Sequence, residues 1–541
     1  MLIGLDFDNT IANYDSLFRE IGLELNLIPQ GWKGNKKDLR NLILTNPKGE
    51  EIWMKIQGKV YGEYMHRAKL TPGVANFLLQ CKLKKIEVCI VSHKTEYGHY
   101  DEKNISLRKE AIKWMFEKNL FDNSFTSLSK DKVFFENTRK EKVTRISEIG
   151  CSHFVDDLPE VFEEPNFPKN TKKILFGYEE NKIDYDLIIF NNWTEISSFI
   201  LGRQDKEIVK LIIKAVSKSN PESIELLEGK GNSQVYKVKI DKREYALKIY
   251  PDGLLDKRPR LKTEFQALNF LHKCKITNVP KPKFKNYELN VGLYSWINGE
   301  EISIITSNEI ESCISFISEL KNISERKSND FKLASEACLS ADNLKLQILK
   351  RFSNLKSIEN ENKNLKDFLE NTFLPLYKKI DKKYFSIWPN ESRKKELDSK
   401  KLILSPSDFG LHNALLTKDN KIAFLDFDYF GWDDPVKLTS DFYWHPAMML
   451  SDDIKNNWLN SMIGLFEDND DTFSIRLHAA LPYYALRWVL IILNEFLDNE
   501  NKRRQHARLS EEYNWEEIKD FQLKKSFNLC SSLIDHIENN S

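Results

Sequence analysis

The chain has 541 residues, and its 81 Lys and Arg balance its 81 Asp and Glu, so its formal net charge is zero. A single hydrophobic core stops growing at about 250–300 residues, so this length predicts at least two domains. The balanced charge argues against nucleic acid or an anionic membrane as a partner.

The seven cysteines show no C-x-x-C spacing, which argues against a disulfide framework and against a zinc site. No run approaches about 18 uncharged apolar residues, the length that a membrane-spanning helix needs. The apolar run at residues 2–5 leads directly into acidic residues and does not resemble a signal peptide. We therefore expect a soluble, cytoplasmic protein.

Through about residue 200, short apolar runs alternate with segments of helical periodicity. The runs are LIGLDF, EVCIVS, HFVDD and KKILF, and the helical segments are VANFLLQCKLKK and SLRKEAIKWMFEKN. This βαβ alternation predicts an α/β domain with a parallel, doubly wound sheet over residues 1–200. Residues 13 to about 70 follow the first strand and are rich in helix formers and aromatic residues. A connection of this length is more typical of a lid over a site than of a loop.

Residues 201–222 predict an amphipathic helix that ends at Ser-Asn-Pro and links two domains. The second domain, residues 223–541, begins with a β-rich part that extends to about residue 300. Its segments SQVYKVKI and EYALKIY flank Asp-Lys-Arg and predict a hairpin. The part from about residue 301 to the end is mainly helical, with one further β-rich patch, LLTKDNKIAFLDFD.

The tetrapeptide LDFD occurs twice, at residues 5–8 and 425–428, in different surroundings. In the first copy, Asp6 and Asp8 leave the C-terminal end of a predicted buried strand and point the same way. Two like charges at that place repel each other and lose hydration, unless a cation such as Mg²⁺ joins them. The alternative is a turn in which one Asp caps a helix.

Other polar residues stand at the ends of the neighbouring predicted strands. Ser92 ends one strand, Asp156 and Asp157 end another, and the basic segment NTRKEKV lies between them. Asp-x-Asp-x-Thr, a strand-end Ser, a Lys and Asp-Asp, in this order, resemble the four motifs of the haloacid dehalogenase superfamily of phosphatases and phosphomutases. The resemblance covers about residues 1–200 and implies a Rossmann-like domain with a helical cap at about residues 13–70.

The resemblance also implies a role for each motif residue. Asp6 would be the nucleophile that takes the phosphoryl group, and Asp8 the general acid and base. Ser92 would donate to a phosphoryl oxygen. The charge-balancing lysine would be Lys140 or Lys142, between which the sequence does not decide.

Mg²⁺ would be held by Asp157, Asp6 and the backbone carbonyl of Asp8, with Asp156 assisting. The presence of Asp8 excludes the dehalogenase branch of the superfamily and indicates phosphate chemistry. The cap favours a small-molecule substrate over a phosphoprotein.

The second LDFD belongs to another constellation. Asp408 stands 18 residues before Asp426, and Asn413 follows Asp408 by five residues. An Asp, an Asn five residues later and an Asp at the end of a following hairpin strand supply the base and two Mg²⁺ ligands for phosphoryl transfer from ATP. A polar loop is the alternative for DFGLHN on its own.

Upstream residues complete this constellation. Lys248 stands in ALKIY, and Glu264 stands in a predicted helix, as a pair that would aim the lysine at the α- and β-phosphates of ATP. A Gly-rich turn between strands would bind ATP through Gly229, Gly231, Asn232 and Ser233. No G-x-x-x-x-G-K-[ST] is present, which excludes a P-loop kinase.

Together these parts resemble the aminoglycoside phosphotransferase and choline kinase family over residues 223–541. The resemblance implies an α+β, two-lobed, protein-kinase-like fold, in which Asp408 is the base, Asn413 and Asp426 bind Mg²⁺, and Lys248 binds ATP phosphates. Asp428 stands where relatives often carry a second acid that helps a second metal. YSWINGEEI resembles the segment that joins the two lobes and meets adenine. Ser407 replaces the usual Gly, and the Gly-rich turn lacks a strict G-x-G-x-x-G.

The two resemblances together predict a bifunctional enzyme that uses Mg²⁺ and ATP. Its N-terminal phosphatase and C-terminal kinase would act on different positions of a sugar, a sugar phosphate or an amino alcohol. The alternative is that one domain has lost catalysis and senses a ligand for the other. The complete set of catalytic residues in both halves argues against that alternative.

Overall fold

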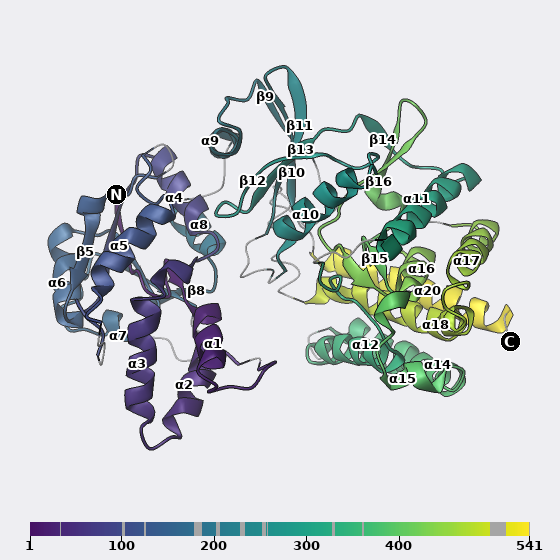
Figure 1. The fold of residues 1–541 in the computed structure, drawn as a ribbon, viewed down its shortest axis with the longest axis horizontal. Coiled ribbons are helices and arrows are strands. Elements are labelled where there is room, and N and C mark those ends of the chain that lie inside the picture. Colours follow the sequence, from purple (N-terminus) through teal and green to yellow (C-terminus); the bar gives the residue numbers. More distant parts are fainter. Residues whose placement is uncertain are drawn as a thin grey trace. The chain divides into compact units, whose positions relative to one another are not determined.

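The computed structural model describes residues 1–539 except residue 33 and residues 100–102, 124–125, 178–186, 202–205, 228–232, 252–255, 257, 327–330, 360–361, 449 and 498–514. The chain forms two compact units, which we call unit 1 (mainly Met1–Ile224) and unit 2 (mainly the residues from Glu225 onward, without Asp252–Leu254 and Glu288–Asn290). In Figure 1, purple to blue follows unit 1, and teal to yellow follows unit 2.

Unit 1 is built around a six-stranded parallel sheet in the order β5-β4-β1-β6-β7-β8. The strands are β1 (Leu2–Leu5), β4 (Glu87–His93), β5 (Val133–Glu136), β6 (His153–Asp156), β7 (Lys172–Phe176) and β8 (Leu187–Phe190). The predicted parallel α/β sheet is therefore confirmed. The edge strands β5 and β8 were not predicted, because they are short and only half-buried and so lack a long apolar run.

The central strand β1 pairs closely with β6 because residue 4 has no side chain. Gly4 lies opposite Phe154 in the parallel register. A Cβ at Gly4 would lie 2.5 Å from Phe154 Cδ2 and 2.8 Å from Cys151 Sγ. Ile3 and Leu5 are fully buried, as expected for the middle of a parallel sheet. The end of β1 is thereby held beside the end of β6.

The helices that accompany the sheet are α4 (Val74–Leu83), α5 (Leu107–Glu117), α6 (Arg139–Ile149), α7 (Pro159–Phe162), α8 (Trp193–Leu201) and α9 (Lys206–Ser217). The segment predicted as a connecting helix, residues 201–222, contains the helix α9. This helix is not a free linker, because it packs against α4 within unit 1. Its apolar face buries Val209, Ile212 and Ile213.

The predicted lid is helical. It contains α1 (Asp15–Glu24), α2 (Lys36–Leu44) and α3 (Gly49–Tyr61), and the short strands β2 (Ala12–Asn13) and β3 (Lys69–Leu70) pair at its base. Phe18 and Trp53 stack with ring centroids 5.2 Å apart in its interior. A capping box between Asn35 and Asp38 begins α2 and makes Lys36 the first residue of that helix. We call residues 13–70 the cap.

Unit 2 begins with a five-stranded sheet in the order β12-β13-β11-β10-β9. The elements are β9 (Ser223–Leu227), β10 (Gln234–Ile240), β11 (Arg243–Ile249), α10 (Arg260–Lys273), β12 (Pro282–Asn286) and β13 (Val291–Ser295). The predicted hairpin is confirmed, because β10 and β11 pair antiparallel along their full length. Asp241 and Lys242 form its turn with φ of 48° and 64°, as a two-residue hairpin with the right-handed strand twist requires.

The rest of unit 2 is mainly helical, as predicted. Its helices include α11 (Ser307–Arg326), α12 (Ala341–Lys356), α13 (Lys363–Phe368), α14 (Leu374–Tyr384), α15 (Asn390–Lys394), α16 (Pro435–Trp444), α17 (Asp452–Phe466), α18 (Phe473–Ile492) and α20 (Trp515–Asn539). Short strands lie among them: β14 (Gly299–Glu301), β15 (Ile403–Ser405), β16 (Ala414–Thr417), β17 (Ile422–Phe424) and β18 (Gly431–Asp433). Phe316, Phe409 and Phe424 pack together in the core beneath the loop that carries Asp408.

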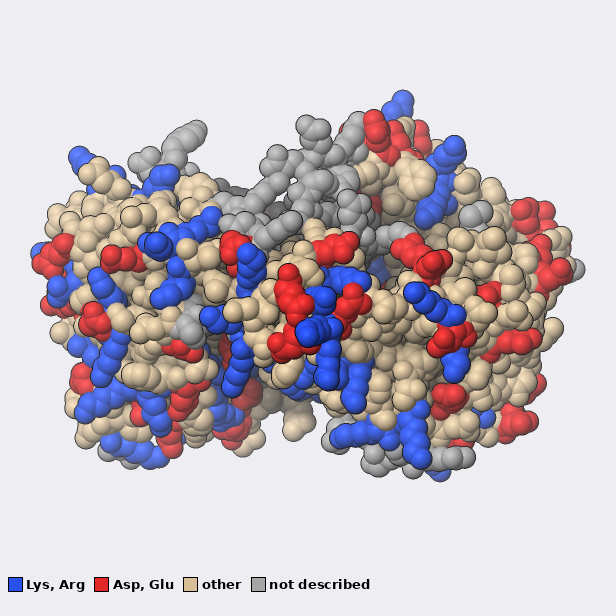
Figure 2. Space-filling view, turned by 90° about the horizontal axis from the view of Figure 1, so that it is seen from above, with Lys and Arg blue, Asp and Glu red and all other residues tan. Residues whose placement is uncertain are grey.

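The surface charges and the character of the helices both follow the composition. Figure 2 shows Lys and Arg side chains interspersed with Asp and Glu on the face that it presents. In the described part of the chain, no helix combines the length and the apolar character that crossing a membrane demands.

Candidate active sites

In unit 1, the polar residues singled out by the sequence meet at the C-terminal ends of three neighbouring strands. Asp6 follows β1, Ser92 lies in β4 and Asp156 ends β6. The Asp6 backbone N–H donates to Val155 at 2.8 Å, and Ser92 Oγ donates to Asp6 Oδ1 at 3.0 Å. All three side chains are almost fully buried. A phosphoryl group at Asp6 would therefore lie within reach of Ser92.

The structure distinguishes between the two candidate lysines of helix α6. Lys142 Nζ donates to Asp6 Oδ1 at 2.5 Å and to Asp156 Oδ2 at 2.6 Å, with 1% of its side chain exposed. Lys140 lies on the exposed side of the same helix. Burial by itself lowers the pKa of Lys142, but Asp156 and Asp6 outweigh burial and raise it, so the ammonium stays charged.

Three carboxylates of unit 1 crowd together in a way that fits a divalent cation. Asp6, Asp156 and Asp157 each offer an oxygen within 4.8 Å of the others. Burial, and then the charge of Asp6, raise the pKa of Asp156 to about 7 in spite of Lys142. Burial, and then the charges of Asp6 and Asp156, raise the pKa of Asp157 well above its usual value. Mg²⁺, which prefers carboxylate oxygens, would relieve this repulsion.

Asp8 has two partners that the sequence analysis did not identify. Lys94 Nζ donates to Asp8 Oδ1 at 2.9 Å and to Oδ2 at 2.8 Å, and Tyr14 OH donates to Asp8 Oδ1 at 2.5 Å. Lys94 follows Ser92 by two residues along β4 and its continuation, so the alternation of a strand could have placed it on the same side. Tyr14 comes from the start of the cap, where no local pattern marks it.

In unit 2, Lys248 joins the predicted residues of the nucleotide site. Its Nζ donates to Glu264 Oε2 in α10 and to Asp426 Oδ1 after β17, each at 2.7 Å. Burial lowers the pKa of Lys248, but Asp426 and Glu264 outweigh burial and raise it. The lysine therefore carries a fixed charge at the place that a phosphate group would occupy. Tyr250 OH also donates to Glu264 Oε2, at 2.7 Å, and holds the glutamate in position.

The second LDFD places two acids beside this lysine. Glu264, Asp426 and Asp428 each offer an oxygen within 4.8 Å of the others, which fits a divalent cation. Burial, and then the charge of Asp426, raise the pKa of Asp428 to about 7, although Arg260 forms an ion pair with it. No group of the described residues forms a hydrogen bond with the buried Oδ1 of Asp428, which is available to a cation.

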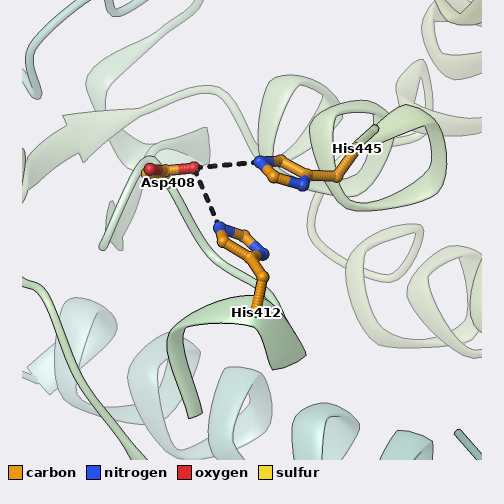
Figure 3. A group of neighbouring side chains, drawn as sticks. All are labelled: Asp408, His412 and His445. Carbon is orange, nitrogen blue, oxygen red and sulfur yellow. Dashed lines mark ion pairs between the residues drawn. The ribbon is translucent and has the colours of Figure 1, made fainter. Parts of the chain in front are cut away.

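Asp408 lies beside two histidines, His412 and His445 (Figure 3). His412 Nε2 and His445 Nε2 lie 3.3 and 3.4 Å from the same oxygen, Asp408 Oδ1. The two imidazole rings stack with centroids 3.7 Å apart. Burial raises the pKa of the Asp408 carboxyl, but the interactions with the imidazoles of His412 and His445 outweigh burial and hold it well below the usual value. Asn413 Nδ2 donates to the Asp408 carbonyl at 3.1 Å.

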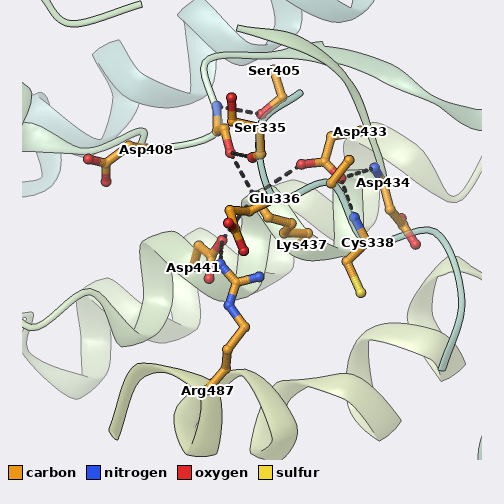
Figure 4. Close-up of polar contacts among 12 residues, drawn as sticks. Ser335, Glu336, Cys338, Ser405, Asp408, Asp433, Asp434, Lys437, Asp441 and Arg487 are labelled. Atoms are coloured by element: carbon orange, nitrogen blue, oxygen red, sulfur yellow. Dashed lines mark hydrogen bonds and ion pairs between the residues drawn. The ribbon is translucent and has the colours of Figure 1, made fainter. Parts of the chain in front are cut away.

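The unusual Ser407 is held by a buried network of charges. Figure 4 labels Lys437, Asp433 and Asp441 of this network. Ser407 has φ of 69°, a conformation that disfavours any residue but Gly. Lys437 Nζ donates to Ser407 Oγ at 2.9 Å and lies 3.0 Å from Asp433 and 3.2 Å from Asp441. Ser407 Oγ in turn donates to the carbonyl of Ser335 at 3.1 Å. These bonds offset the strain and fix the backbone just before Asp408.

We expect Lys437→Met to destabilise unit 2 by about 3–5 kcal/mol, because it leaves Asp433 buried without its cation. Urea unfolding of the full chain, followed by circular dichroism, would measure the loss. Lys418→Met, in an exposed turn of the same unit, is the matched control and should change stability little. A Lys437→Met protein as stable as the control would contradict the assignment of Lys437 as the support of this loop.

Part of the predicted Gly-rich turn lies outside the described residues: Gly229, Gly231 and Asn232. Ser233 is described and is buried at the start of β10. His412 and His445, which contact Asp408, were not identified from the sequence. His412 immediately precedes Asn413 and could have been noticed there.

Residues 223–460 match the family model described as "Phosphotransferase enzyme family". No curated protein matches the chain. This family match does not extend to residues 1–222, so the haloacid dehalogenase resemblance of unit 1 stays a prediction.

The similar solved structures include a choline kinase, an ethanolamine kinase and the gentamicin-APH(2")-IIa complex. Choline kinase from Streptococcus pneumoniae is 14% identical, with 60% of this chain and 99% of that chain covered and a TM-score of 0.41. Ethanolamine kinase from Plasmodium vivax is 13% identical, with 61% of this chain and 91% of that chain covered and a TM-score of 0.38. The gentamicin-APH(2")-IIa complex is 15% identical, with 60% of this chain and 96% of that chain covered and a TM-score of 0.39. The match to the phosphotransferase enzyme family covers residues 223–460, less than half of this chain.

Proposed function

We propose that unit 2 transfers the γ-phosphoryl group of ATP to a hydroxyl group of a small molecule. The observation that carries this proposal is Lys248, whose ammonium contacts both Glu264 and Asp426 at 2.7 Å. In phosphoryl transfer from ATP, such a lysine binds the phosphates, and an acid beside it holds the metal. The match of residues 223–460 to the phosphotransferase enzyme family supports the same reaction.

In this reaction Asp408 accepts the proton of the acceptor hydroxyl. The acceptor oxygen then forms a bond to the γ-phosphorus, the bond from that phosphorus to the β,γ-bridging oxygen breaks, and ADP leaves. His412 and His445 both engage Oδ1 of Asp408 and so leave Oδ2 to the substrate. Mg²⁺ held by Asn413 and Asp426, with Asp428 beside them, would neutralise charge on the phosphates.

We also propose that unit 1 is a phosphatase of the haloacid dehalogenase type, because Lys142 contacts both Asp6 and Asp156. Asp6 attacks the phosphorus of a phosphomonoester, the bond to the leaving group breaks, and Asp8 gives that group a proton. Water then attacks the aspartyl phosphate and gives a proton to Asp8, which releases phosphate and restores Asp6. Asp6, Asp156 and Asp157 would hold Mg²⁺, which would stabilise the charge of the phosphoryl group.

Opposite activities in one chain are useful when they act on different positions. We propose that the substrates are sugars, sugar phosphates or amino alcohols, with one hydroxyl phosphorylated by unit 2 and a phosphate at another position removed by unit 1. The alternative is that one unit senses a ligand for the other. Phosphate release and ATP consumption, assayed separately against a panel of these compounds, distinguish the two, because a sensing unit would bind ligands without turnover.

We expect Lys248→Met to weaken binding of Mg²⁺ and a non-hydrolysable ATP analogue by about 10- to 100-fold, because a charge-assisted contact to the phosphates is lost. Calorimetry measures this binding without an acceptor. Lys242→Met, in the exposed turn between β10 and β11, is the control and should bind as the wild type does. If the wild type bound no nucleotide, the kinase would be excluded. Unchanged binding in Lys248→Met would place the nucleotide elsewhere.

A further inference from the structure

The cap of unit 1 brings a second positively charged region to the proposed phosphatase site. We propose that Lys36, with Lys94 and Tyr61, forms a subsite for a second anionic group on the leaving group of the substrate. This group would be a carboxylate or a further phosphate. The inference rests on the proposed phosphatase function, and it names the class of substrate: phosphomonoesters that carry another negative charge.

Lys36 is a cation held by neutral groups. Its Nζ donates to Asn9 Oδ1 at 3.2 Å and to Tyr61 OH at 3.1 Å, and it lies 4.9 Å from the centre of the Phe18 ring. Among the residues that the structure describes, no carboxylate forms an ion pair with it. Burial by itself lowers the pKa of Lys36, but Tyr61 and the charges of Asp157 and Asp8 outweigh burial and raise it. The half-buried ammonium therefore stays charged and would attract an anionic ligand.

Asn9 ties Lys36 to the catalytic centre. Its Nδ2 donates to Asp157 Oδ2 at 3.1 Å, while its Oδ1 accepts from Lys36. Asn9 directly follows Asp8 and has φ of 60°, a conformation that Asn tolerates better than most residues. One amide therefore links the proposed metal ligand to the cap lysine. The ammonium lies at the edge of the site and not at a distant part of the cap.

Tyr61 links the two lysines. Its ring centre lies 5.8 Å from Lys36 Nζ and 5.0 Å from Lys94 Nζ, and its ring meets that of Tyr14 edge to face at 4.9 Å. Lys94 is buried and bound to Asp8, whereas Lys36 is partly exposed and can meet a ligand. The cap helices α2 and α3 thus supply one lysine and the aromatic ring between the two lysines.

The position of Lys36 in the site decides which part of the substrate its ammonium contacts. Ser92 and Lys142 surround Asp6, where the transferred phosphoryl group binds. Lys94 and Tyr14 surround Asp8, which protonates the leaving group. Lys36 shares the Tyr61 ring with Lys94, which binds Asp8, so we place its partner on the leaving group. An uncharged sugar as the leaving group would offer only hydroxyl groups to the Lys36 ammonium, whereas a leaving group with a negative charge would neutralise it.

Three probes that differ at carbon 1 test the inference: glucose 6-phosphate, the acyclic acid 6-phosphogluconate and glucose 1,6-bisphosphate. Phosphate release by the full chain is measured with Mg²⁺. We expect kcat/KM for at least one of the two more anionic probes to exceed that for glucose 6-phosphate by about 10- to 100-fold. The carboxylate probe and the bisphosphate probe distinguish the two kinds of anion.

Variants of helix α2 assign the preference to one side chain. Lys36→Met should bring the kcat/KM ratio close to one, and Lys36→Arg should keep most of it. Lys37→Met, at the exposed neighbouring position of the same helix, should leave the ratio unchanged. A ratio near one in the wild type, or a high ratio that survives in Lys36→Met, overturns the subsite but leaves the phosphatase intact. Absence of phosphate release from all three probes and from p-nitrophenyl phosphate overturns the phosphatase, and the subsite with it.

Discussion

Asp6→Asn is expected to lower phosphate release on the order of 10⁴- to 10⁶-fold while kinase turnover stays within a few-fold of the wild type. The amide keeps the size of the side chain but removes the nucleophile. Asp6 accepts hydrogen bonds from Ser92 and Lys142 at the end of β1, and neither contact involves unit 2. The loss should therefore be confined to one activity.

Two assays on the same purified protein measure this separation, one for phosphate and one for ADP. Asp131→Asn, at an exposed position of unit 1, is the matched control and should retain both activities. Circular dichroism confirms that each variant is folded. A folded Asp6→Asn protein that also lost kinase turnover would contradict two independent sites. Full phosphate release in Asp6→Asn would remove Asp6 from the role of nucleophile.

Asp408→Asn is expected to lower kinase turnover by about 10²- to 10⁴-fold with nucleotide affinity nearly unchanged. Asp408 is held by His412 and His445 and, among the described contacts, makes none with Lys248 or Asp426. Its loss removes the acceptor of the hydroxyl proton and leaves the phosphate-binding groups in place.

Asp426→Asn should behave differently, because the same carboxylate contacts Lys248 and would hold Mg²⁺. Both turnover and affinity for Mg²⁺ with an ATP analogue should fall. Turnover is followed by a coupled ADP assay with the acceptor found by screening, and affinity by calorimetry. Asp419→Asn, in an exposed turn after β16, serves as the control for both. If Asp408→Asn weakened nucleotide binding as much as Asp426→Asn, the separate roles of base and metal ligand would be wrong.

The sequence by itself was sufficient to place the residues at strand ends. Asp6, Ser92 and Asp156 each follow or end an apolar run that forms a parallel strand. Because parallel strands end at the same edge of a sheet, local pattern alone predicted that they meet. The same holds for the hairpin that carries Lys248, where the turn residues and the alternation of β10 and β11 are local signals.

Helical positions and distant contacts needed the tertiary structure. Lys140 and Lys142 are two residues apart, which turns their side chains about 200° from each other on a helix, but only the packing of α6 decides which one faces Asp6. His445 comes 37 residues after Asp408, at the end of α16, and no local pattern joins the two. Lys36 is the first residue of α2, and Tyr61 is the last residue of α3, so these two cap residues belong to different helices. Periodicity describes how one segment faces its neighbours, whereas these contacts arise only when whole elements pack together.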